Sequence, residues 1–165
     1  MNEVLLEAVR HSHWATRTLA AACRELSTER LEEPGPGFGR IRATLDHTVE
    51  CDAAYTTAIQ VNHPEWAADR RKAATLDDVE ARAEDCLRRW EELLDSPVDG
   101  ERLLVLDEGR YVCPVSVVLT QALHHASAHR EQVRARLVGR GLPAPAPPSW
   151  SYASDTHPAR RKPPE

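Results

Sequence analysis

Apolar residues recur at three- and four-residue steps along four segments of the chain, and this helical period limits the possible folds more than any other feature. A helix with one apolar stripe must bury that stripe against other elements. The expected helices run over about 2–26, 39–61, 76–95 and 114–138. Four amphipathic helices of similar length predict an all-α fold, an up-and-down four-helix bundle.

Local signals mark several ends of these helices. Thr75 is a good N-cap, and the acidic residues Asp77 and Asp78 follow it in the first turn of the third helix. Pro114 suits the first position of the fourth helix, and Gly139 suits the cap at its C-terminal end. The boundaries are therefore predicted by residue chemistry as well as by the period.

The segments on either side of the fourth helix lack a helical period. Two short apolar runs, Leu103–Leu106 and Tyr111–Cys113, predict a small hairpin or loop before it. Proline is frequent from Pro143 onward, which predicts an extended tail. A chain of 165 residues can fold around a single hydrophobic core. We expect one domain over 1–142 and a proline-rich tail over 143–165, packing on the bundle or trailing from it.

The overall composition excludes several classes of protein. The chain is 41% hydrophobic and 28% charged, which is ordinary for a globular protein, and its net charge of -5 offers no general attraction for nucleic acid. No apolar stretch approaches the roughly 18 residues that cross a membrane, and the N-terminal residues do not resemble a signal peptide. The four cysteines form no C-x-x-C pair, which favours a reducing compartment. We expect a cytoplasmic protein.

The fourth helix carries two histidines, His125 and His129, that stand four residues apart. Residues at this spacing share one face of a helix, with β-carbons about 5–6 Å apart. Two imidazoles can then share one ion at about 2.0–2.1 Å each. Val118, Ala122 and Val133 lie on the same stripe, so both rings are expected to point into the bundle. The pair is a candidate for two metal ligands, although such pairs also occur on solvated faces.

A third histidine, His47, lies close to the inward stripe of the second helix. Two helices of one bundle can thus supply three imidazoles to a single point. We predict one divalent metal ion, Zn²⁺ or Ni²⁺, bound by His47, His125 and His129. Three protein ligands leave one coordination position open, which is the pattern of catalytic rather than structural sites. Alternatively, the three are core or surface histidines that bind no ion.

Several neighbouring residues have more ordinary expected roles. Cys51 lies one turn after His47 and could approach the ion, but a small core residue is the favoured interpretation. Asp52 and Glu50 are candidate acceptors for the second ring nitrogen of a ligand histidine. Further residues are expected at or near the surface: His11 and His13 partly exposed, His124 exposed or in a subunit contact, and Arg130 as an exposed helix arginine.

Four segments together resemble the DinB/YfiT-like superfamily of metal-binding four-helix bundles, the damage-inducible family unrelated to the polymerase of that name. The segments are His13-Trp14-Ala15-Thr16-Arg17, Gly39-Arg40-Ile41-Arg42-Ala43-Thr44-Leu45-Asp46-His47, His125-Ala126-Ser127-Ala128-His129-Arg130-Glu131-Gln132-Val133 and Pro147-Pro148-Ser149-Trp150-Ser151-Tyr152-Ala153. The second and third segments, which carry the three histidines, are the specific part of the resemblance.

The resemblance implies a metal site near one end of the bundle and a homodimer. Characterised relatives include maleylpyruvate isomerases and S-transferases that use mycothiol, bacillithiol or glutathione. We therefore expect a metal-dependent enzyme that moves a low-molecular-weight thiol onto, or through, a small electrophile. Two alternatives stay open, namely a metal-binding protein without catalysis, structural or stress-related, and a helical interaction module without metal. Shared fold alone does not transfer a reaction.

Overall fold

The computed structural model describes residues 3–35, 39–68, 74–146 and 149–157. These residues are mostly helical, with a small two-stranded antiparallel sheet, so the expected all-α class is confirmed. The elements are α1 (Glu3–Cys23), α2 (Thr28–Glu32), α3 (Ile41–Gln60), η1 (Glu65–Ala68), α4 (Leu76–Asp95), β1 (Leu103–Leu106), η2 (Asp107–Gly109), β2 (Tyr111–Pro114), α5 (Val115–Val138) and α6 (Ser149–Thr156).

The predicted helix ends agree closely with the observed ones because they depend on local chemistry. Thr75 and Asp78 form a reciprocal capping box, in which each side chain accepts a hydrogen bond from the backbone N–H of the other residue. Pro114 is the N-cap of α5 rather than its first residue, and Gly139 is the C-cap. The predicted hairpin is confirmed as β1 and β2, with Leu104 opposite Cys113. The short helix α2 was not predicted.

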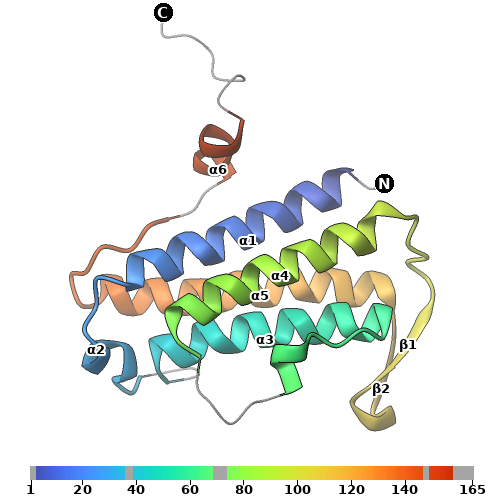
Figure 1. The fold of residues 1–165 in the computed structure, drawn as a ribbon, viewed down its shortest axis with the longest axis horizontal. Helices are drawn as coiled ribbons and strands as arrows, with labels where there is room; N and C mark the ends of the chain where they lie inside the picture. The colour runs from blue at the N-terminus through green and yellow to red at the C-terminus, as the bar shows by residue number, and fades with distance from the viewer. Residues whose placement is uncertain (1–2, 36–38, 69–73, 147–148, 158–165) are drawn as a thin grey trace, which may run out of the picture.

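The helices do not alternate in direction, so the expected up-and-down order is wrong. Residues early in α3 contact residues early in α4, and later residues contact later ones. Arg82 donates to Asp46 at 2.6 Å, and the indole N–H of Trp90 donates to Asp52 at 2.9 Å. The helices α3 and α4 are therefore parallel, and Figure 1 shows both running from left to right, with α1 and α5 running the other way.

Each long helix packs against two others, and consecutive long helices are not always neighbours. The helix α1 packs against α4 and α5, and α3 packs against the same two helices. Arg10 pairs with Glu91 and Arg24 pairs with Glu80, so α1 and α4 are antiparallel. The helices α3 and α5 are antiparallel neighbours, since Arg136 near the end of α5 donates to Gly39 before the start of α3. This arrangement places a long shared seam between α3 and α5.

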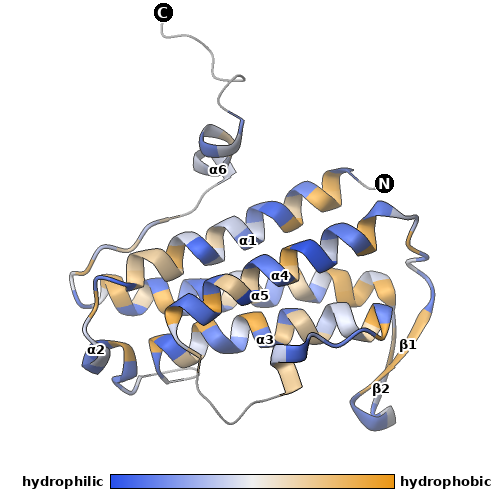
Figure 2. Cartoon of the chain, in the orientation of Figure 1, coloured by the Kyte–Doolittle hydropathy of each residue, from blue (hydrophilic) through white to orange (hydrophobic). Residues whose placement is uncertain are grey.

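The buried apolar side chains form two clusters along the helices. One includes Leu19, Leu45 and Val133, and the other includes Val9, Trp90 and Val118. Buried polar residues occupy the levels between them: Ser12, His13, Thr16, Asp52, Thr56 and Arg130. Figure 2 shows apolar and polar residues mixed along each long helix, as expected for helices with one buried face.

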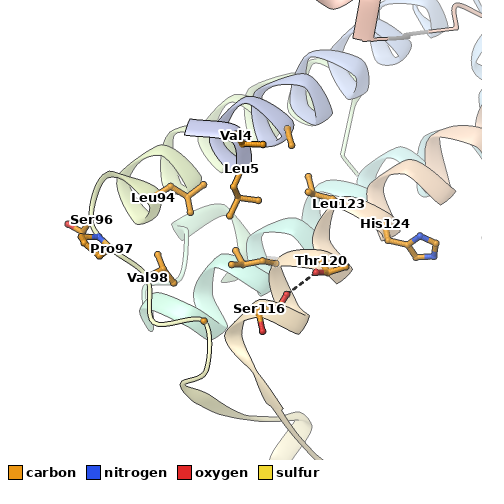
Figure 3. Close-up of a pocket in the computed structure, with 13 residues that line it drawn as sticks. Val4, Leu5, Leu94, Ser96, Pro97, Val98, Ser116, Thr120, Leu123 and His124 are labelled. Carbon is orange, nitrogen blue, oxygen red and sulfur yellow. Dashed lines mark hydrogen bonds between the residues drawn. The ribbon is translucent and has the colours of Figure 1, made fainter. Parts of the chain in front are cut away.

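A groove of about 900 Å³ lies where α1 begins, α4 ends and α5 begins. Its walls are mainly apolar and include Leu5, Leu94 and Leu123, while the exposed His124 lies at its edge (Figure 3). His124 is thus a surface residue, as expected. The histidines predicted as metal ligands do not line this groove.

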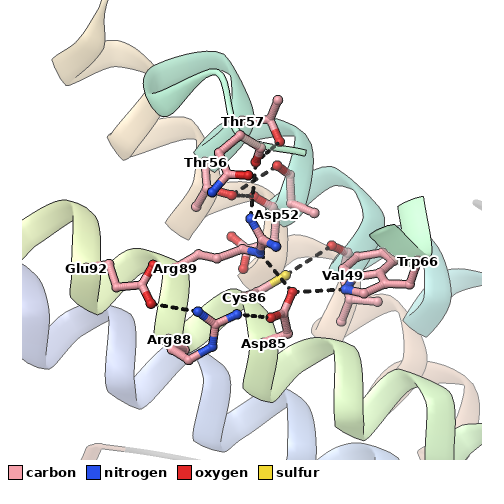
Figure 4. A network of polar contacts seen from close by, with 12 residues as sticks. Val49, Asp52, Thr56, Thr57, Trp66, Asp85, Cys86, Arg88, Arg89 and Glu92 are labelled. Atoms are coloured by element: carbon pink, nitrogen blue, oxygen red, sulfur yellow. Dashed lines mark hydrogen bonds and ion pairs between the residues drawn. The ribbon is translucent and has the colours of Figure 1, made fainter. Parts of the chain in front are cut away.

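The connection between α3 and α4 is fixed to α4 by polar contacts. Trp66 of η1 donates its indole N–H to Asp85 at 3.0 Å, and Arg89 donates to the backbone oxygen of Asn62 at 3.1 Å. Arg88 and Arg89 also bind Asp85, which makes this carboxylate the centre of the network in Figure 4. The contacts hold residues 62–66 along α4, in the direction of its N-terminal end, as a parallel arrangement of α3 and α4 requires.

The tail contains a helix where an extended segment was expected. The helix α6 packs on α1, with Tyr152 buried and its ring centroid 5.6 Å from that of Trp14. His157 lies 2.9 Å from a carboxylate oxygen of Glu7. Burial of the tyrosine favours a helix between the prolines, and residues 143–146 before it are neither helix nor strand. Residues 147–148 and 158–165 of the predicted tail lie outside the described residues.

No helix in the described parts of the chain combines the length and the apolar character needed to span a membrane.

Candidate metal centre

The seam between α3 and α5 brings the three predicted histidines together. His47 is on α3, and His125 and His129 are one turn apart on α5. The ring centroid of His47 lies 5.2 Å from that of His125 and 4.9 Å from that of His129. One nitrogen of each ring can be chosen such that all three lie within 4.8 Å of one another. Their convergence needs the antiparallel contact of two helices, which sequence spacing alone does not specify.

His129 is held in a defined orientation by Gln132. Its Nδ1 lies 2.9 Å from Oε1 of Gln132, three residues further along α5. An amide oxygen can only accept, so Nδ1 of His129 carries the proton and Nε2 bears the lone pair. His129 is also buried, at 7% exposure. The ring therefore presents Nε2 to the other two histidines.

The spacing of the donor atoms fits a shared ion. The Nε2 atoms of His125 and His129 lie 3.0 Å apart. Two nitrogens bound at about 2.0–2.1 Å to one tetrahedral ion would lie about 3.4 Å apart, so a small adjustment of the side chains suffices. The residues present therefore fit a divalent metal ion that accepts imidazole.

The protonation of the site also suits a cation. Burial lowers the pKa of His47, and repulsion from His129 lowers it further. Burial together with repulsion from His129 and His47 lowers the pKa of His125 to about 4. Both rings are thus neutral at neutral pH, and a neutral imidazole is the form that binds a metal.

The site lies on the flank of the helices rather than in the apolar core. His129 is buried as expected, whereas His47 and His125 are half-buried. Both histidines of α5 face α3, as predicted, but only His129 is fully buried. The expected position near one end of the bundle is wrong, because His125 and His129 lie near the middle of α5, between Ala122 of one apolar cluster and Val133 of the other.

Cys51 is closer to the candidate site than a core residue would be. Its sulfur lies 3.4 Å from Nε2 of His47, one turn earlier on α3. It is half-buried, and neither apolar cluster of the described residues contains it. Cys23, in contrast, is a fully buried member of the first cluster. The interpretation of Cys51 as a small core residue is therefore wrong.

The expected acceptors Asp52 and Glu50 are not the partner of His129. Gln132 has that role instead, and its position three residues after the histidine is the signal that could have identified it. Asp52 is buried, accepts the indole N–H of Trp90, and lies 3.1 Å from Nε2 of His13. Its contacts therefore lie on the core side of α3.

Two residues expected at the surface are buried beside Asp52. His13 is 6% exposed and Arg130 is 7% exposed. Arg130 donates to the backbone oxygen and hydroxyl of Ser12 and to the hydroxyl of Thr16, at 3.0–3.2 Å. Burial lowers the pKa of Arg130 to about 10, so it still carries its charge at neutral pH. These bonds fix α5 against α1 with His129 turned toward α3.

Comparison with known proteins agrees with this geometry. The family model described as the DinB family matches residues 1–158. The match covers all three histidines, both sides of the α3–α5 seam and α6. No curated protein matches the chain.

Proposed function

The chain belongs to the DinB family, and on that premise we propose that it binds one divalent metal ion through His47, His125 and His129. The convergence of three imidazole nitrogens from two helices within 4.8 Å is the observation that carries this proposal. Zn²⁺ and Ni²⁺ are the ions that this donor set suits best. Three protein ligands leave one coordination position for a small molecule.

We further propose that the protein is a metal-dependent enzyme of the thiol S-transferase or thiol-dependent isomerase type, acting on a small electrophile. When bound, the ion would lower the pKa of a coordinated thiol, so that a thiolate nucleophile exists at neutral pH. Gln132 would orient His129 for binding. The half-buried positions of His47 and His125 leave the site accessible from solvent, as a diffusible thiol requires.

The alternative function is metal binding without catalysis. The contact between Cys51 and His47 favours it, because a fourth protein donor would close the coordination sphere as in structural sites. A homodimer and a low-molecular-weight thiol as co-substrate belong to the enzymatic proposal, and both follow from the family rather than from the geometry.

Metal analysis of matched histidine variants tests the ligand set. Purified protein should contain one equivalent of metal, and His125→Ala should lose most of it. His124→Ala is the matched control, since the exposed His124 is adjacent in sequence but lines the groove between α1, α4 and α5 instead of the α3–α5 seam (Figure 3). Loss of metal from His124→Ala with retention in His125→Ala would contradict the proposed site.

An activity assay then separates the two functions. The metallated protein is incubated with small electrophiles and a panel of cellular thiols, and consumption of both is followed. Thiol-dependent turnover that His125→Ala abolishes would support the enzyme. No turnover with any thiol, in fully metallated protein, would leave metal binding without catalysis as the proposed function.

A further inference from the structure

Two pairs of side chains with four-residue spacing face each other across the α3–α5 seam. His47 and Cys51 form the pair on α3, and His125 and His129 form the pair on α5. The Cys51 sulfur lies 3.4 Å from Nε2 of His47, and the two histidines of α5 are 3.0 Å apart at their Nε2 atoms. Two potential donors from each of two antiparallel helices therefore lie along this seam.

The distances within both pairs suit ligands of one ion. A nitrogen at about 2.0 Å and a sulfur at about 2.3 Å from one tetrahedral ion lie about 3.6 Å apart. The His47–Cys51 distance is close to that value. Among the described residues, the group whose donor atoms all lie within 4.8 Å consists of the three histidines. The Cys51 sulfur lies outside that group, 3.4 Å from Nε2 and 3.7 Å from Nδ1 of His47, so ligation requires the Cys51 side chain to turn toward the histidines of α5.

We propose that Cys51 is the fourth, displaceable ligand of the ion, a role that rests on the proposed three-histidine site. On binding, the Cys51 thiol gives its proton to solvent and its sulfur bonds to the ion, with no change in oxidation state. An external thiol displaces Cys51: the sulfur of the external thiol takes the fourth coordination position, and its proton is transferred to the Cys51 sulfur. In the absence of a competing thiol, the Cys51 side chain therefore occupies the fourth coordination position.

Cobalt substitution tests the role of Cys51 without an activity assay. Metal-free protein is titrated with Co²⁺ alone, in buffer without added thiol, while absorption and bound cobalt are both measured. The wild-type protein should develop a thiolate-to-cobalt charge-transfer band that saturates at one equivalent. Cys51→Ser should bind cobalt without this band and with an affinity at least about tenfold lower, as loss of a metal-site contact typically causes.

Cys113→Ser is the matched control, because Cys113 is equally half-buried but lies on β2, outside the seam. This variant should keep the band. Cys51→Ala provides a second variant, and circular dichroism verifies that each protein is folded. Adding an external thiol to Cys51→Ser should restore a band.

The outcomes separate this inference from the proposed function. Stoichiometric cobalt binding by wild-type protein without the band would overturn the role of Cys51 and leave the three-histidine site intact. A band that persists in Cys51→Ser without added thiol would also overturn it. Failure of the folded wild-type protein to bind cobalt at all would instead contradict the metal site on which the inference rests.

Discussion

Asp52 Oδ2 on α3 and His13 Nε2 on α1 lie 3.1 Å apart. This contact joins two long helices that are separated by α4 and α5, and both side chains are buried. Asp52 also accepts the indole N–H of Trp90 on α4 at 2.9 Å. The carboxylate therefore connects three helices at the level between the two apolar clusters.

Asp52→Ala should destabilise the fold without removing the metal. The change leaves the Trp90 N–H without its acceptor and His13 without its carboxylate, and an unsatisfied buried polar group costs about 1–3 kcal/mol. Urea unfolding measures this loss, and Asp52→Asn should lose less because it keeps an oxygen for Trp90. A folded Asp52→Asn protein without bound metal would instead show that Asp52 supports the metal site.

Gln132→Ala should weaken metal binding about 10- to 100-fold, as the loss of an outer hydrogen-bond partner of a ligand histidine typically does. The physical reason is that His129 loses the acceptor that fixes its proton on Nδ1. Competition with a chelator of known affinity measures the change. Glu131→Ala is the control, since the neighbouring Glu131 binds Arg134 at the surface. Equal affinities of the two variants would contradict this orienting role for Gln132.

Removal of the metal should lower the melting temperature while leaving the helical circular dichroism largely unchanged. Two apolar clusters hold the long helices together independently of the histidines, and a ligand that binds the folded state adds stability according to its free concentration and affinity. Thermal scans before and after chelation, with readdition of Zn²⁺, measure the shift. Collapse of the helical signal on chelation would favour a structural ion.

Asp85→Asn should reduce stability at neutral pH but not in acid. Burial raises the pKa of Asp85, but hydrogen bonds from Arg89, Trp66 and Arg88 outweigh this effect and hold the pKa below its ordinary value. A carboxylate with a lowered folded-state pKa contributes stability above its unfolded pKa of about 3.9. That contribution is lost as the pH falls through the folded value.

Urea unfolding at several pH values measures this dependence. The free energies of unfolding of wild-type and Asp85→Asn protein should converge below about pH 4. Glu92→Gln is the control, because Glu92 is an exposed partner of Arg88 and such pairs contribute little. A difference between wild type and Asp85→Asn that stays constant down to pH 3 would show that the carboxylate charge is not the cause.

The sequence alone determined the features that depend on neighbouring residues. The reciprocal bonds of Thr75 and Asp78 form within one turn, so the start of α4 could be predicted. The spacing of His125 and His129 places both on adjacent turns of one helix face. The helical period also placed His47 near an inward face. That His47 joins His125 and His129 in one site did not follow from the period alone, and depended also on the fact that three imidazoles can bind one ion.

Only the tertiary structure decided which helices are neighbours and in which direction they run. The 15 residues 61–75 can span about 50 Å when extended, more than the roughly 30 Å length of α3, so the connection permits α4 to run either way. In the structure α4 runs parallel to α3, and α3 packs against both α4 and α5. A period of 3.6 residues defines a face of a helix but not what covers it, which is why the burial of His13 and Arg130 and the contact of Cys51 with His47 could not be predicted.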